Sequence, residues 1–144
     1  MSGGPVQLTI GARERTVLTE RAMAAMERAY APYSGFRVGA AILGSDGSIA
    51  EGCNVENASY PAGICAERAA ISAAIARGVR DFSAIVIATE ADRPTPPCGM
   101  CRQVMMEFAP QLEVVSVTRG GVDARWTMSD LLPEAFTPTS LGRT

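Results

Sequence analysis

Three cysteines in this sequence have spacings that suit a metal ion or a redox pair. Cys98 and Cys101 form a CxxC motif, and Cys65 opens the tetrapeptide Cys-Ala-Glu-Arg earlier in the chain. A CxxC motif is typical of metal clamps and of thioredoxin-like redox sites. A redox pair should follow the first strand of a thioredoxin pattern, whereas this motif follows a late apolar run and a proline-rich loop. Buried thiols are the ordinary alternative, which a lone cysteine would favour more strongly than these three do.

The remaining cysteine and the lack of histidine narrow the chemistry further. Cys53 ends a predicted strand without a partner at ligand spacing, so we expect it to pack as a small buried residue. The 144 residues include no histidine. This excludes Ser-His-Asp and Cys-His nucleophilic machinery, and a metal site in this chain must therefore use Cys, Asp or Glu.

The clustered cysteines favour a catalytic zinc site. Cys65 and Cys98 each stand at a predicted helix start, where the helix dipole and unpaired N–H groups stabilise thiolates. Three protein ligands leave a fourth position on zinc for water, and zinc lowers the pKa of that water toward ~7. Glu67 follows Cys65 closely enough to accept the proton of the water and pass it on. Without the cysteines, Glu67 would be interpreted as a first-turn acid that favours the helix dipole.

Two arginines stand beside the cysteines. Three thiolates on Zn²⁺ carry a net negative charge, and hydrogen bonds from the Arg68 guanidinium would withdraw part of it. A solvated helix arginine is an equally good interpretation of Arg68 from sequence alone. Arg102, next to Cys101, is a second candidate for the same task or for an interface.

These residues must be positioned by secondary structure, and the pattern is that of an α/β protein. Apolar periodicity and turn residues predict helices over 16–31, 64–77, 98–108 and 129–132, and strands over 36–43, 48–53, 82–89, 112–118 and 124–128. Two strands followed by alternating helices and strands imply a mixed central sheet with helices on both faces. We therefore expect one domain over 1–144, a three-layer α/β/α sandwich, with 1–15 and 137–144 poorly ordered.

Bulk properties exclude several classes of partner. Hydrophobic residues make up 47% of the chain and charged residues 19%, and the net charge is −2. This balance opposes a polyanion-binding surface, so we expect no nucleic-acid partner. No apolar run is long enough to cross a bilayer, and the N-terminal residues lack the apolar core of a signal peptide. We therefore expect no membrane partner and a cytoplasmic location.

The cysteine motifs also carry a family resemblance. Cys65-Ala-Glu67 together with Pro97-Cys98-Gly-Met-Cys101 resembles the H/C-x-E and P-C-x-x-C signature of the zinc nucleoside and nucleobase deaminases. The Cys-Ala-Glu form and the small size are similar to the homotetrameric cytidine deaminases. The likeness extends over most of the chain, through segments 33–41, 52–60, 65–68, 97–103 and 131–136.

The resemblance implies a reaction and a metal. It implies the fold already expected, one Zn²⁺ per chain on Cys65, Cys98 and Cys101, and proton transfer by Glu67. The reaction would be hydrolytic deamination of cytidine and 2′-deoxycytidine to uridine, 2′-deoxyuridine and ammonia, a step of pyrimidine salvage. A deaminase of a nucleoside antibiotic such as blasticidin S is the alternative within the fold.

The resemblance also implies the substrate contacts and a homotetramer with shared sites. These are Phe36 against the base, the Ala66 N–H on the base carbonyl, Asn54 and Glu56 on the ribose hydroxyls, and Ala58, Tyr60 and Phe136 from neighbouring subunits. Purely structural roles stay open for the three aromatic residues: Phe36 could be a core residue, Tyr60 could anchor its loop, and Phe136 could cover the sheet.

Substrate class follows from the polar pair in segment 54–57. Asn54 and Glu56 point the same way on an extended segment, and a carboxylate there would accept sugar hydroxyls and repel a 5′-phosphate. Nucleosides are therefore expected as substrates, rather than nucleotides or free cytosine. A structural zinc module would need a fourth protein ligand, and a nucleic-acid-editing deaminase would need a basic groove. The sequence offers neither.

Overall fold

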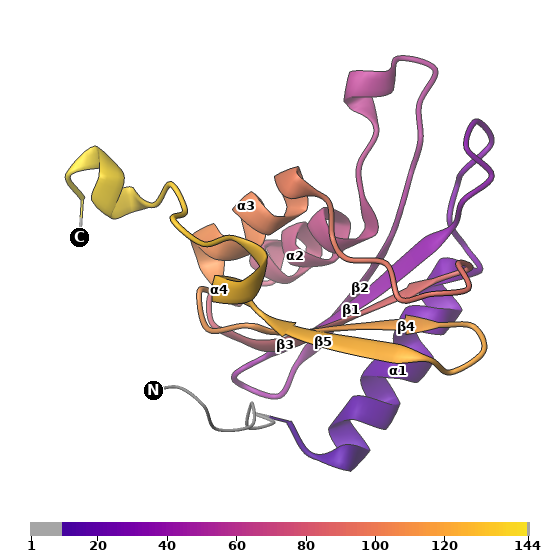
Figure 1. Ribbon diagram of the computed structural model, residues 1–144, viewed down its shortest axis with the longest axis horizontal. Helices are drawn as coiled ribbons and strands as arrows, with labels where there is room; N and C mark the ends of the chain where they lie inside the picture. Colours follow the sequence, from indigo (N-terminus) through magenta and orange to yellow (C-terminus); the bar gives the residue numbers. More distant parts are fainter. Residues whose placement is uncertain (1–9, 144) are drawn as a thin grey trace.

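A five-stranded mixed sheet forms the centre of the computed structural model, which describes residues 10–143 (Figure 1). The strand order is β2-β1-β3-β4-β5; β3 and β4 are parallel, and the other neighbours are antiparallel. The strands are β1 (Val38–Gly44), β2 (Ile49–Cys53), β3 (Phe82–Thr89), β4 (Glu113–Thr118) and β5 (Asp123–Thr127). The mixed sheet predicted from the sequence is confirmed.

Helices cover both faces of this sheet, which confirms the three-layer sandwich. Helix α1 (Ala12–Met26) packs on one face, and α2 (Ala66–Ala76) and α3 (Gly99–Phe108) lie together on the other (Figure 1). The short helix α4 (Met128–Leu131) follows β5 beside α3. Two 3₁₀ turns, η1 (Tyr60–Ala62) and η2 (Pro138–Leu141), complete the elements. Within residues 10–143, no helix combines the length and the apolar character needed to span a bilayer.

Helix α1 differs from its predicted bounds at both ends. It begins at Ala12 rather than at residue 16, because the Gly11 N–H is capped by Glu14 Oε1 at 3.1 Å. It ends at Met26, and Tyr30 then pairs with Val55, a long-range bridge that ends the periodic pattern early. Residues 10–15, which were expected to be poorly ordered, thus include the first turn of α1, whereas residues 1–9 lie outside the described residues.

A glycine in β2 sets the distance between the sheet and α2. A Cβ atom at Gly52 would lie 2.4 Å from Ala70 N and 2.6 Å from Ala66 O, so only glycine fits beneath the first turns of this helix. The start of α2, which carries Cys65 and Glu67, is therefore held against the sheet by backbone contact.

The other predicted elements are found close to their predicted positions. The helix predicted over 64–77 is α2, and Gly78, with φ +91°, follows its end as a left-handed residue. The helix predicted over 129–132 starts one residue earlier because Thr127 Oγ1 accepts the Asp130 N–H and caps it.

Candidate active site

The three predicted ligand cysteines come together between the starts of two helices. Cys65 is the N-cap of α2, Cys98 is the N-cap of α3, and Cys101 lies in the first turn of α3. The Sγ atoms of Cys65 and Cys98 are 3.8 Å apart, and those of Cys98 and Cys101 are 3.3 Å apart. All three sulfur atoms lie within 4.8 Å of one another.

This donor set fits zinc. Tetrahedral zinc with Zn–S bonds of about 2.3 Å places its sulfur ligands about 3.8 Å apart, close to the separations seen here. Among the described residues, the group consists of these three cysteines without a fourth carboxylate or thiol. Three protein ligands are typical of a catalytic zinc site. Cys53 stands apart, half-buried, with its Sγ 3.8 Å from the carbonyl oxygen of Arg28.

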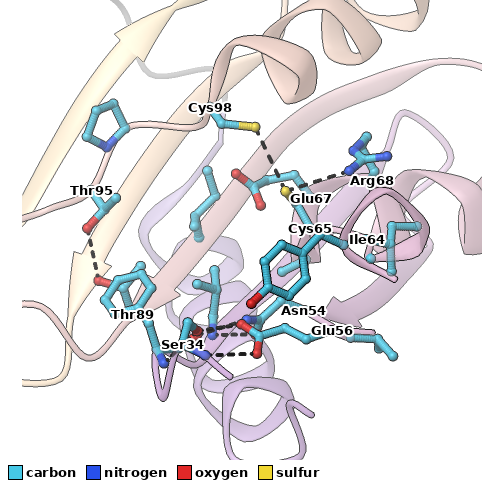
Figure 2. A pocket seen from close by; sticks show the side chains of 18 residues that line it. Ser34, Asn54, Glu56, Ile64, Cys65, Glu67, Arg68, Thr89, Thr95 and Cys98 are labelled. Atoms are coloured by element: carbon cyan, nitrogen blue, oxygen red, sulfur yellow. Dashed lines mark hydrogen bonds between the residues drawn. The ribbon is translucent and has the colours of Figure 1, made fainter. Parts of the chain in front are cut away.

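Hydrogen bonds polarise the thiol cluster. A hydrogen bond from Cys101, and then one from Arg68, lower the pKa of the Cys65 thiol to about 5. Bonding to Cys65 and burial raise the pKa of Cys101. Arg68 Nη2 lies 3.8 Å from Cys65 Sγ, which favours the withdrawal of thiolate charge over the solvated-arginine interpretation (Figure 2).

Glu67 brings a buried carboxylate to the same place. It lies in the first turn of α2, and only 5% of its surface is exposed. Burial raises the pKa of Glu67 to about 7. Figure 2 shows its carboxylate pointing toward the thiols of Cys65 and Cys98. A carboxyl group in this position can exchange protons with a reactant bound beside the sulfur atoms.

A cavity of about 450 Å³ extends from the thiols to the segment around residues 54–56. Nine of the predicted site residues line it: Phe36, Asn54, Glu56, Tyr60, Cys65, Ala66, Glu67, Arg68 and Cys98. Mostly apolar walls with a few converging polar groups are typical of small-molecule sites.

The polar groups at the far end of the cavity are already bonded to backbone. Asn54 Oδ1 accepts the Val38 N–H at 2.8 Å, and its Nδ2 donates to Phe36 O at 2.8 Å. Glu56 Oε1 accepts the N–H groups of Tyr33 and Ser34 at 2.9 and 3.1 Å. The Ser34 hydroxyl donates to Glu56 Oε2, and this bond is the main cause that lowers the pKa of Glu56.

Three predicted site residues do not line this cavity, and one of them is Cys101, which is buried behind the other two thiols. Ala58 is exposed, and so is the side chain of Phe136 (59%), whose carbonyl oxygen accepts a bond from Gln103. Tyr60 lines the cavity of its own chain but is 77% exposed, and its ring meets that of Tyr33 edge to face at 6.2 Å. Phe36 is 36% exposed, so it is not a core residue.

Arg102 has a different function from Arg68. Its Nε donates to Pro97 O and its Nη1 to Leu131 O, both at 2.8 Å. It therefore braces the residue before Cys98 against the end of α4, and its hydrogen bonds go to carbonyl groups rather than to the thiols.

Three polar cavity residues had no role in the sequence prediction. Ser34 lies within segment 33–41 of the family resemblance and was given no site role, although it lines the cavity. Thr89 and Thr95, whose hydroxyl oxygens are 3.4 Å apart, come from the end of β3 and from the loop before Cys98. The position of Thr89 at the carboxyl end of a central strand was the one available signal, because ligands of open α/β sheets bind there.

Known proteins match this chain over most of its length. The family model described as the cytidine and deoxycytidylate deaminase zinc-binding region matches residues 13–117. The cytidine deaminase of Halalkalibacterium halodurans is 48% identical over 125 residues, which are 86% of this chain and 95% of the relative. That of Mycobacterium tuberculosis is 39% identical over 120 residues, 83% and 87% of the two chains.

Solved structures agree with these matches. The crystal structure of cytidine deaminase from Burkholderia pseudomallei has a TM-score of 0.82 at 51% identity, over 84% of this chain and 98% of that one. The matched zinc-binding region contains Cys65, Cys98 and Cys101, so the cofactor predicted from the sequence, zinc, is confirmed. With a family match over more than half of its length, the chain belongs to the cytidine and deoxycytidylate deaminase family.

Proposed function

We propose that this chain catalyses the zinc-dependent hydrolytic deamination of cytidine and 2′-deoxycytidine, giving uridine, 2′-deoxyuridine and ammonia. The observation that carries the proposal is one cavity with a buried carboxylate and two thiols of the three-cysteine cluster at one end and an amide–carboxylate pair at the other. Relatives that are 48% and 51% identical are cytidine deaminases, which supports this substrate over an antibiotic nucleoside such as blasticidin S.

The thiol end would perform the chemistry. Cys65, Cys98 and Cys101 would hold one Zn²⁺, which when bound activates water as a nucleophile and stabilises negative charge. Glu67 would accept a proton from the water that adds to C4 of the base and deliver it to N3. It would then take the remaining proton of the new C4 hydroxyl and pass it to the departing amine, as the C4–N bond breaks and the carbonyl forms. Arg68 would moderate the charge of the thiolates.

The rest of the cavity would hold the nucleoside. Ala66 is the first residue of α2, so its N–H has no partner within the helix and can donate to the base carbonyl. Phe36 would pack on the base, and Asn54 and Glu56 would receive the ribose hydroxyls. The Glu56 carboxylate would repel a 5′-phosphate, so CMP and dCMP should be poor substrates.

For the assembly, the proposal is a cytoplasmic homotetramer in pyrimidine salvage, with each chain a single domain over 1–144. Tyr60 and Phe136 are large apolar side chains that remain 77% and 59% exposed in the single chain. Exposed aromatic residues of this kind are typical of protein interfaces, and with Ala58 they would complete the site of a neighbouring subunit. Light scattering should give the mass of four chains, and an active monomer would refute this part.

Kinetics on matched substrates test the activity. The purified protein should contain about one zinc per chain and should have its highest kcat/KM on cytidine and deoxycytidine. CMP, free cytosine and blasticidin S are the comparison substrates. A higher kcat/KM for CMP or blasticidin S than for cytidine would contradict the proposed substrate.

A further inference from the structure

Ser34 connects two cavity residues that come from different segments. Its hydroxyl donates to Glu56 Oε2 and accepts the N–H of Phe36, the latter at 3.0 Å. Its own N–H donates to Glu56 Oε1 at 3.1 Å. One serine thus touches both the carboxylate of Glu56 (Figure 2) and the backbone of Phe36, a residue that lines the cavity.

Both backbone polar groups of Phe36 are hydrogen-bonded to side chains that line the cavity. Its N–H goes to Ser34 Oγ, and its carbonyl oxygen accepts a bond from Asn54 Nδ2 at 2.8 Å. Asn54 also accepts the Val38 N–H. The position of the Phe36 ring therefore depends on the same hydrogen-bond network that includes Asn54 and Glu56.

The network leaves capacity for a ligand on one oxygen. Glu56 Oε1 accepts two N–H groups, from Tyr33 and Ser34, whereas Oε2 accepts only the Ser34 hydroxyl among residues 10–143. A carboxylate oxygen accepts two hydrogen bonds well, so Oε2 can receive one further hydroxyl. A ligand hydroxyl bound there would share its acceptor with Ser34 and would extend the chain from the Phe36 N–H through Ser34 to Glu56.

We propose that Ser34 is a specificity-determining residue that couples recognition of the sugar hydroxyls at Glu56 to the position of Phe36 against the base. This inference rests on the proposed function. Ser34 acts on the substrate through Glu56 and Phe36, so it is a positioning residue. A nucleoside uses the whole network, while free cytosine, which has no sugar, gains nothing from an ordered Glu56.

Removal of the hydroxyl alone tests the coupling. Ser34→Ala keeps the Ser34 N–H bond to Glu56 and loses the other two. The KM for cytidine should rise roughly tenfold, because the loss of one hydrogen bond to a charged group weakens binding by about that factor. The kcat should change less than about twofold. The kcat/KM for cytosine should fall less than that for cytidine, because cytosine loses only the support of the Phe36 backbone, so the preference for cytidine over cytosine should fall several-fold.

Binding without turnover gives a second measurement. Calorimetry with uridine, the proposed product, should show a similar loss of affinity in Ser34→Ala and recovery of most of it in Ser34→Thr, which keeps a hydroxyl. Ser48→Ala is the matched control, because Ser48 Oγ donates to Asp46 Oδ1 at 2.6 Å in an exposed turn that does not line the cavity. Ser48→Ala should leave the kinetics of cytidine and cytosine and the affinity for uridine unchanged.

The outcomes separate this inference from the proposed function. An active wild-type protein whose Ser34→Ala variant keeps its cytidine KM, or loses cytidine and cytosine turnover equally, overturns the role of Ser34 alone. Failure of Ser34→Thr to recover uridine affinity overturns the role of the hydroxyl. A wild-type protein that does not deaminate cytidine at all overturns the proposed function, and the inference with it.

Discussion

The two ends of the cavity are built on different principles. At the thiol end, Cys98 Sγ lies 3.8 Å from Cys65 Sγ and 3.3 Å from Cys101 Sγ. Within residues 10–143, Arg68 is the one positive side chain hydrogen-bonded to this cluster. At the far end, Asn54 and Glu56 are bonded to backbone N–H and carbonyl groups at 2.8–3.1 Å. The thiol end therefore gathers groups that repel one another once they ionise. At the far end, hydrogen bonds within the chain already occupy the polar groups of Asn54 and Glu56.

This difference decides what a substitution should change. Thiolates at such distances are stabilised together by a cation, so metal content and rate should respond to changes at the thiol end. The far end is ordered by its own hydrogen bonds, so affinity should respond there while metal content stays the same. The predictions below test this separation, from the largest expected effect to the smallest.

The largest effect is expected from Cys98→Ala. The loss of one of three ligands should remove most of the zinc and reduce deamination to background, as measured by metal analysis and cytidine turnover. Cys53→Ala is the control, since its sulfur lies outside the cluster. Full zinc in Cys98→Ala, or zinc loss in Cys53→Ala, would show that the ligand set is wrong.

Glu67→Gln should separate rate from metal at the same end. The amide has nearly the same shape but cannot carry protons, so kcat should fall by ~10²–10⁴. Zinc content and uridine affinity should remain close to those of the wild type. Metal analysis, single-turnover kinetics and uridine calorimetry measure the three quantities. Turnover near the wild-type rate would exclude Glu67 as the proton carrier.

The sequence predicted the thiol end more completely than the far end, for a physical reason. Ligand residues must lie at helix starts with short spacings, and Cys65, Glu67 and the CxxC motif record that requirement locally. The contacts of Ser34 with Glu56 depend instead on the bridge between Tyr30 and Val55, which joins distant parts of the chain. No local pattern encodes that pairing, and for the same reason helix α1 was predicted to continue too far.

Glu56→Gln tests the far end. The amide loses the charge that accepts three donors from Tyr33 and Ser34, so the KM for cytidine should rise by about 10- to 100-fold, as expected for a hydrogen bond to a charged group. Zinc content should stay the same. CMP should lose less kcat/KM than cytidine, because the repulsion of its phosphate disappears with the charge. Unchanged cytidine kinetics would rule out Glu56 as a sugar contact.

The smallest effect is expected where the two ends are joined. Glu90 follows Thr89 at the end of β3, and its carboxylate accepts the N–H of Arg37 at 3.0 Å and the Arg37 guanidinium at 2.6–3.0 Å. Arg37 follows Phe36, and the loop after Glu90 leads to Cys98. The pair therefore ties the segment of Phe36 to the segment that leads to a zinc ligand.

Acid titration should reveal this link as a small pH-dependent contribution to stability. The Arg37 guanidinium holds the pKa of Glu90 below its ordinary value of 4.5, so the folded state binds its proton less tightly than the unfolded state does. The contribution is therefore complete above pH 4.5 and is lost as the pH falls through the lower folded pKa. The Tm of Glu90→Gln should be slightly below that of the wild type at pH 7, because the pair is partly exposed, and the difference should disappear in acid. Glu107→Gln is the control, because Glu107 is exposed on α3, and its Tm should stay close to that of the wild type at both pH values. If Glu90→Gln lowered the Tm equally at pH 7 and in acid, the charge of Glu90 would contribute nothing to the link.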